Sequence, residues 1–172
     1  MSKSFVPFLQ QQSEILLLNV QDQIKDADLE VVLDGVNNSR YLFHMLHSME
    51  KYFFNPYEYK YEEKETLGIE ENYSVIDDQR EGYIKDDELI ISREKLQQYF
   101  NLVAEKIRDY LENITDEELL EKPENCPHTR FELILGQYRH IMFHLGISEA
   151  LTVQSKNMWP KYTGFKYIKS KV

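Results

Sequence analysis

Apolar residues recur at helical spacing in four stretches of the chain. In the clearest stretch, about 40–54, they stand at i, i+3, i+4, i+7 and i+11: Leu42, Met45, Leu46, Met49 and Phe53. A second regular stripe lies between Ser92 and Ile114 and contains Leu96, Phe100, Val103, Ile107, Tyr110 and Leu111. The stretches 5–24 and 129–154 are less regular but apolar on one side, with Phe8, Ile15, Leu16 and Leu18 in the first. Because a helix repeats every 3.6 residues, this pattern predicts four long helices.

Polar residues mark where these helices begin and end. The segment DGVNNSR breaks the first helix, and Asn38 or Ser39 is placed to cap the second. The second helix should end at Asn55–Pro56, since the residue before proline avoids the helical region. Ser92 can cap the third helix. The segments TDEE (115–118) and TRFE (129–132) have the form of capping boxes, which predicts a short helix after the first and the fourth long helix after the second.

An acidic block separates the second and third predicted helices. Residues 57–90 contain twelve Asp or Glu and four Lys or Arg, with little periodicity. This is long for a connection between helices of a bundle. We interpret it as an insertion with one short helix, which could act as a lid, an interface or a solvated loop.

Size and composition favour one globular domain, 1–172, with an all-α fold: a four-helix bundle, up-down-down-up, with the 57–90 insertion after its second helix. The net charge of −10 makes nucleic-acid binding an unfavourable interpretation, because phosphate backbones would be repelled. The apolar runs are too short for a membrane span, and the N-terminus lacks the features of a signal peptide. The single cysteine, Cys126, cannot form an internal disulfide. We therefore expect a cytoplasmic protein.

Four histidines on two of the predicted helices are the candidate metal-binding residues. His140 and His144 stand one turn apart, so their imidazoles can bind one metal ion together. On the second helix, His47 lies at about 140° from Leu42, beside phenylalanine rings, and His44 at about 200°, away from the stripe. This helical-wheel projection therefore predicts that His47 faces the interior and that His44 faces solvent. Three imidazoles with an open position are typical of catalytic zinc, and nickel or iron also suit imidazole.

Other interpretations of these residues stay open at this point. A histidine pair at this spacing is often packed in a core or exposed, with no ligand. Cys126 precedes the fourth helix, and Glu50 follows His47 by one turn, so either could close the site as a fourth ligand. Glu50 could also support His47 or act as a base, and Gln137 could line the pocket.

The histidine motifs resemble those of the DinB/YfiT-like superfamily of four-helix-bundle metalloenzymes. FHMLHSMEKYF and RHIMFHLG match the helix-two and helix-four motifs of that family over the same helical order. On this resemblance His47 is the helix-two ligand, and His140 and His144 are the helix-four pair. Gly146 matches the family glycine, whereas Ile147 replaces the usual glutamine, and the resemblance does not extend to residues 57–90.

The resemblance implies a divalent metal, zinc or nickel, and a hydrolase or a thiol-dependent transferase acting on a small molecule. A metal-bound water near neutral pKa suits hydrolysis, and a bound thiol loses its proton. It also implies a possible homodimer. The alternative is a non-catalytic bundle for stress-linked binding or dimer assembly, with the metal structural or absent. An open coordination position reaching solvent would favour catalysis, and a fourth protein ligand would favour a structural role.

Overall fold

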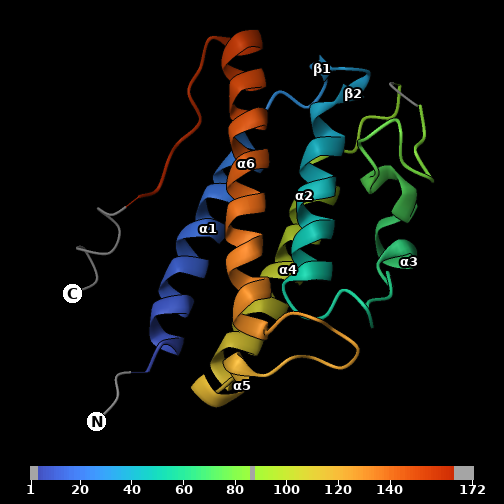
Figure 1. Cartoon of the computed structure of the whole chain (residues 1–172). Helices are drawn as coiled ribbons and strands as arrows, with labels where there is room; N and C mark the ends of the chain where they lie inside the picture. The colour runs from blue at the N-terminus through green and yellow to red at the C-terminus, as the bar shows by residue number, and fades with distance from the viewer. Residues whose placement is uncertain (1–3, 86–87, 165–172) are drawn as a thin grey trace.

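The computed structural model of the chain describes residues 4–85 and 88–164 and is mostly helical (Figure 1). Its four long helices are α1 (Val6–Asp26), α2 (Asn38–Tyr52), α4 (Arg93–Asn113) and α6 (Arg130–Lys156). Shorter helices are α3 (Lys64–Leu67), the 3-10 helix η1 (Glu71–Ser74) and α5 (Asp116–Leu120). The four predicted long helices and the short one after Ile114 are therefore confirmed, with shifts of one or two residues at their ends.

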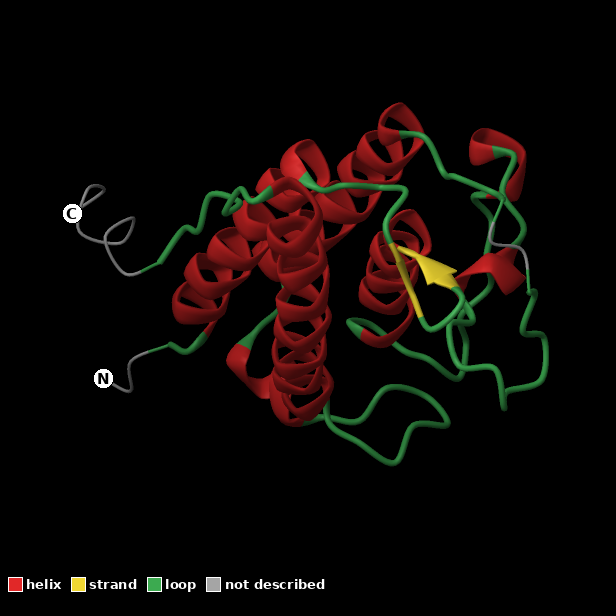
Figure 2. Cartoon of the chain, turned by 90° about the horizontal axis from the view of Figure 1, so that it is seen from above, coloured by secondary structure: helices red, strands yellow, loops and turns green. Residues whose placement is uncertain are grey.

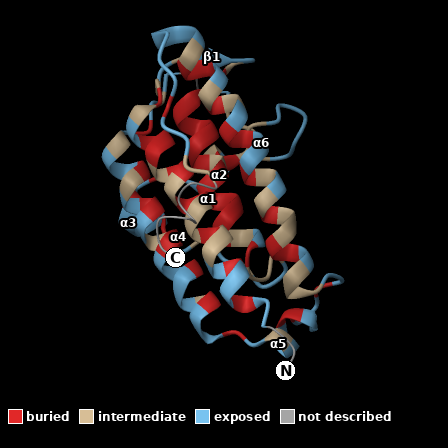
Figure 3. Cartoon of the chain, turned by 90° about the vertical axis from the view of Figure 1, so that its left-hand side faces the viewer, coloured by how far each residue is buried: buried red, intermediate tan, exposed pale blue. Residues whose placement is uncertain are grey.

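The four long helices contact one another in a ring. α1 packs on α4 and α6, and α2 packs on the same two helices. The start of α4 lies beside the end of α1 in space, since the guanidinium of Arg93, the first residue of α4, donates hydrogen bonds to carbonyls at the end of α1. α6 also ends there, because Thr152 accepts a hydrogen bond from the Asp28 amide. Buried residues line the facing sides of the helices, and exposed ones lie outside (Figure 3).

The predicted stripes form the core. All five apolar positions of the second helix are completely buried, and so is most of the α4 stripe. The pattern predicted for the first helix fits less well, because Phe8 is 68% exposed, Ile15 and Leu18 are half-buried, and only Leu16 of its four residues is buried. The N-caps of α4, α5 and α6 are Ser92, Thr115 and Thr129, as expected, and the last two form complete capping boxes.

Two local predictions were wrong. The N-cap of α2 is Asn37, whose side chain accepts a hydrogen bond from the Arg40 amide, rather than Asn38 or Ser39. A small antiparallel hairpin of β1 (Val32–Leu33) and β2 (Val36–Asn37) also precedes α2, so the chain is not purely helical. Asp34 and Gly35 both have positive φ, which is what a tight two-residue hairpin turn requires.

The described part of the acidic insertion packs on the helices rather than extending into solvent. η1 lies against α2, and α3 contacts α4. Figures 1 and 2 place this insertion on the side of the molecule opposite to the segment after α6. That segment packs back on α1: Lys161 pairs with Asp22 at 3.0 Å, and Asn19 exchanges two hydrogen bonds with the Thr163 backbone. Residues 165–172 lie outside the described part of the chain.

None of the helices described is both long enough and apolar enough to cross a membrane.

Candidate metal centre

Three imidazoles meet between α2 and α6. They belong to His44, in the middle of α2, and to His140 and His144 on α6, and one nitrogen from each ring lies within 4.8 Å of the other two. Their ring centroids are 4.5 Å apart for His140 and His144, 4.6 Å for His44 and His144, and 5.5 Å for His44 and His140. This cluster could hold a metal ion.

The α2 member of the cluster is His44, whereas the sequence predicted His47. The wheel assumed that α2 has one buried face and one solvent face. In the structure every residue from Asn38 to Glu50 except His44 is buried, because α4 and α6 cover one side of the helix and the insertion covers another. His44 itself is only partly exposed. A position far from the apolar stripe therefore points into the molecule, toward α6.

The insertion fixes the orientation of the His44 ring. The Nδ1 atom of His44 lies 2.6 Å from the carbonyl oxygen of Ser74, at the end of η1. A carbonyl only accepts hydrogen bonds, so Nδ1 carries the proton and Nε2 of the neutral ring keeps its lone pair. Backbone carbonyls hold metal-binding histidines in proteins in this way.

Two ring nitrogens of the cluster lack hydrogen-bond partners. Nε2 of His44 and Nδ1 of His144 are buried, and neither meets a partner among the described residues. Burying such an atom unpaired costs about 1–3 kcal/mol. Among the described residues, the one hydrogen bond of the His140 ring is long, 3.3 Å from Nε2 to the Ser48 hydroxyl. A metal ion bound by the three rings would give such nitrogens a partner, so the donor set fits one.

Burial keeps the histidines neutral, which metal binding requires. It lowers the pKa of His44 from its ordinary 6.5 to about 4, against the opposing hydrogen bond to Ser74. The pKa of His144 falls to about 3 through burial and the neighbouring histidines. Burial, helped by the positive charge of Arg80, also lowers the pKa of His140.

His47 lies outside this cluster and pairs with a carboxylate instead. Its Nε2 is 2.9 Å from Oε1 of Glu71, on η1, and its ring packs edge-on against Tyr59. Its side chain is 8% exposed and that of Glu71 is 45% exposed. Burial lowers the pKa of His47, and the hydrogen bond to Glu71 opposes that shift. His47 is therefore well placed to exchange a proton with Glu71.

The cluster and His47 line one large cavity of about 1050 Å³. Exposed residues such as Arg139 and Glu132 also line it, so it reaches the surface. Gln137, which the sequence marked as a possible lining residue, is part of it, and its buried Oε1 has no partner among the described residues. The cavity is large enough for a small organic molecule beside the histidines.

Neither candidate fourth ligand reaches the cluster. Glu50 is buried and accepts hydrogen bonds from Tyr59 at 2.8 Å and Tyr99 at 2.7 Å, and it pairs with Lys106. Cys126 is buried in the loop before α6. In the part of the chain that the structure describes, the metal-binding group contains only the three histidines.

Sequence reasoning missed the residues that arrange this centre. His44 had a usable signal, because residues 38–50 contain only two charged side chains, Arg40 and Glu50, and so offer no solvent face. Glu71 and Ser74 had none, since nothing in an aperiodic acidic block indicates which residues fold back on α2.

Comparisons of the chain with protein-family models, with curated proteins and with solved structures gave no match. A helical protein with three neighbouring histidines is compatible with the DinB/YfiT resemblance. Membership of that superfamily remains a hypothesis that rests on the histidine motifs.

Proposed function

We propose that this protein is a metal-dependent enzyme that acts on a small molecule in the cavity between α2, α6 and the insertion. The observation that supports it best is the pair of buried ring nitrogens, one on His44 and one on His144, with no partner in the described structure. They belong to a three-histidine cluster that lines a cavity reaching the surface. An open cavity beside a three-ligand centre is the arrangement of a catalytic metal rather than of a structural one.

In this proposal His44, His140 and His144 hold one divalent ion, zinc or nickel, through neutral imidazoles. The bound ion would supply Lewis acidity, which suits either hydrolysis or the transfer of a small thiol. His47 and Glu71 would hold a proton at the cavity wall and pass it to or from the substrate. This assigns the ligand role on α2 to His44 in place of His47.

We infer that the four long helices form an up-down-down-up bundle of the DinB/YfiT type. Support comes from their ring of contacts and from the ends of α1 and α6 and the start of α4, which lie together. The insertion adds a wall that the resemblance does not include. Dimerisation and a cytoplasmic location stay predictions.

The competing interpretation is a non-catalytic helical protein whose metal is structural or absent. With a structural metal, this interpretation requires a closed centre with a fourth protein ligand; with no metal, it requires that the histidines bind no ion, which the metal analysis below tests. The cluster contains no fourth such group among the described residues, and Glu50 is bonded elsewhere. These observations favour the enzyme.

The test is metal analysis of protein purified without a histidine tag. We expect close to one zinc or nickel ion per chain in the parent, and little in the His140→Ala/His144→Ala variant. Equal, negligible metal in both after incubation with either ion would contradict the proposal.

The cobalt-loaded protein then separates catalysis from structure. An added small thiol that reaches an open position changes the visible absorption of bound cobalt, whereas a closed four-ligand centre leaves it unchanged. Small esters and thiol acceptors are the substrates to assay with the zinc-loaded and nickel-loaded forms.

A further inference from the structure

A buried arginine joins α2 to the acidic insertion. Arg40, in the first turn of α2, is completely buried. Its Nη1 donates to the Ile84 carbonyl at 2.7 Å and its Nη2 to the Val75 carbonyl at 2.8 Å, and Nε makes a longer bond to Tyr73. The guanidinium carbon also lies 5.7 Å and 5.5 Å from the ring centres of Tyr73 and Tyr83.

The residues that Arg40 binds flank the one that orients His44. The Tyr73 and Val75 carbonyls accept from the guanidinium, and the carbonyl between them, that of Ser74, accepts from Nδ1 of His44. Arg40 and His44 are also one turn apart on the same helix. One turn of α2 therefore holds the 73–75 backbone through two side chains, Arg40 at one end of the turn and His44 at the other.

We infer that Arg40 is a positioning residue for the metal centre: by holding the 73–75 backbone, it keeps the Ser74 carbonyl against His44 Nδ1 and leaves Nε2 free toward α6. This inference rests on the proposed metal site. It also gives the acidic insertion a function, because part of it becomes the support of a ligand.

The chemistry of the side chain supports this assignment. Burying a guanidinium is costly unless its donors are satisfied, and here they bind carbonyls of two separate parts of the insertion. A planar guanidinium offers five donors in a fixed fork, which lysine cannot reproduce. Without the fork, the Ser74 carbonyl can move away, and the His44 proton can then shift to Nε2, where it blocks the lone pair.

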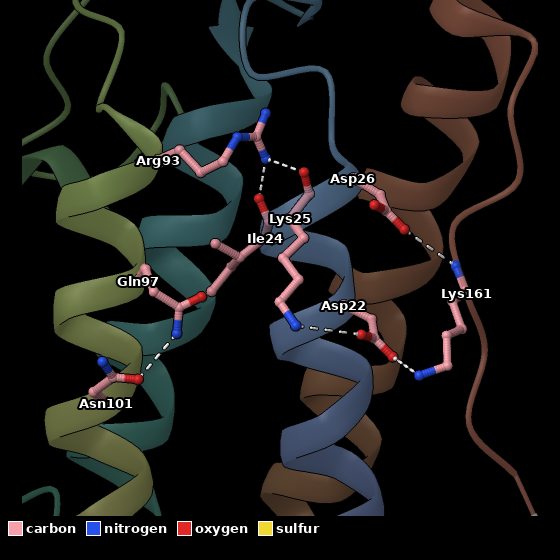
Figure 4. A network of polar contacts seen from close by, with 8 residues as sticks. All are labelled: Asp22, Ile24, Lys25, Asp26, Arg93, Gln97, Asn101 and Lys161. Atoms are coloured by element: carbon pink, nitrogen blue, oxygen red, sulfur yellow. Dashed lines mark hydrogen bonds and ion pairs between the residues drawn. The ribbon is translucent and has the colours of Figure 1, made fainter.

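Arg93 provides a matched control. Its guanidinium also binds backbone carbonyls at the end of α1, those of Ile24 and Lys25 (Figure 4) and that of Ala27. It makes the same kind of contact between two segments, but the carbonyls that it binds belong to residues 24–27, none of which is next to a residue that bonds a cluster histidine. Its loss should lower stability without changing the metal centre.

The experiment titrates zinc into the metal-free full chain, against a chromophoric chelator, for the parent, Arg40→Lys, Arg40→Gln and Arg93→Gln. His140→Ala/His144→Ala gives the background from surface binding. Groups that hold metal ligands typically contribute about 10–100-fold to affinity. We expect a loss of this size in both Arg40 variants and no change in Arg93→Gln.

A second readout needs no metal. Long-range ¹⁵N–¹H NMR correlations of the imidazoles report which nitrogen of His44 carries the proton. We expect the Nδ1–H form alone in the parent and in Arg93→Gln, and a mixture of both forms in Arg40→Lys.

Two results would overturn the inference: parent-like zinc affinity in a folded Arg40→Lys, or a single Nδ1–H form of His44 in that variant. If neither Arg40 variant folds, Tyr83→Leu, which removes one ring beside the guanidinium, is measured instead, with a smaller loss expected and parent-like values contradicting the inference. A parent that binds neither zinc nor nickel in the same titration would refute the metal site, and the NMR readout would still decide the role of Arg40.

Discussion

His44 and Ser74 are joined by a hydrogen bond of 2.6 Å between the His44 Nδ1 and the Ser74 carbonyl. This bond links the centre of α2 to the acidic insertion and fixes the tautomer of the ring. It explains why the histidine farther from the apolar stripe of α2 joins the α6 pair. It also separates the roles of the two α2 histidines, because His47 uses its Nε2 to bind Glu71.

The two α2 histidines should respond differently to substitution. We expect His44→Ala to weaken zinc binding by more than about 100-fold, the upper range for groups that merely support a ligand. His47→Ala should stay within a few-fold of the parent, since it removes no ligand. Competition titration of the metal-free proteins measures both. The reverse order of effects would restore His47 as the ligand.

Zinc should stabilise the folded chain through its histidines. A ligand that binds only the folded state adds about 2.7 kcal/mol when its free concentration is 100 times Kd. We expect the melting temperature of the parent to rise with zinc, and that of His140→Ala/His144→Ala to remain unchanged. The measurement is differential scanning calorimetry with and without zinc. An equal rise in both proteins would indicate binding elsewhere.

The metal-free protein should lose stability in acid because of the buried histidines. Their pKa values are about 4 for His44 and about 3 for His144 in the folded state, against 6.5 when unfolded. Below pH 6.5 the unfolded chain therefore binds more protons than the folded one, and the free energy of unfolding falls as the pH drops toward 4.

The measurement for this pH effect is urea unfolding between pH 7 and pH 4. We expect His144→Gln to show a shallower decline than the parent, and His128→Gln, which changes an exposed histidine, to keep the parent slope. Identical slopes in parent and His144→Gln would mean that His144 is not buried in its neutral form.

The Glu50 network should support the fold but not the metal centre. Tyr99 is completely buried, and its hydroxyl donates to Glu50 at 2.7 Å. A hydrogen bond to a charged group contributes about 1.5–3 kcal/mol, so Tyr99→Phe should lower the free energy of unfolding by that amount and leave zinc affinity unchanged. Urea unfolding and zinc titration check this, with the exposed Tyr57→Phe as control. A weaker zinc affinity in Tyr99→Phe would connect Glu50 to the centre.

Local sequence signals predicted the helices well, whereas the position of the insertion and the choice of the α2 histidine depend on long-range packing. The caps at Ser92, Thr115 and Thr129 depend on residues three positions apart, so they can be identified without tertiary contacts. The α6 histidine pair is likewise a property of a single helix. The hairpin at Asp34–Gly35 was not predicted, although Asp-Gly is a strong local signal for such turns; we interpreted this segment only as a break in the first helix.

The choice between His44 and His47 depended on what covers α2. Helical periodicity identifies the face that packs on other helices, and it treats every remaining face as solvent. Here an aperiodic segment, Glu71–Ser74, covers one of those faces. The position of such a segment is set by contacts such as Arg40 with Val75 and Ile84, which no local pattern reveals.

The most direct test of the central claim is an anomalous diffraction measurement at the zinc edge, on crystals of the zinc-loaded full chain. The account predicts one strong peak between α2 and α6, bonded by His44, His140 and His144, with a remaining coordination position open to the cavity. A peak bonded by His47 in place of His44, one closed by a fourth protein ligand, or no peak at these histidines would contradict it.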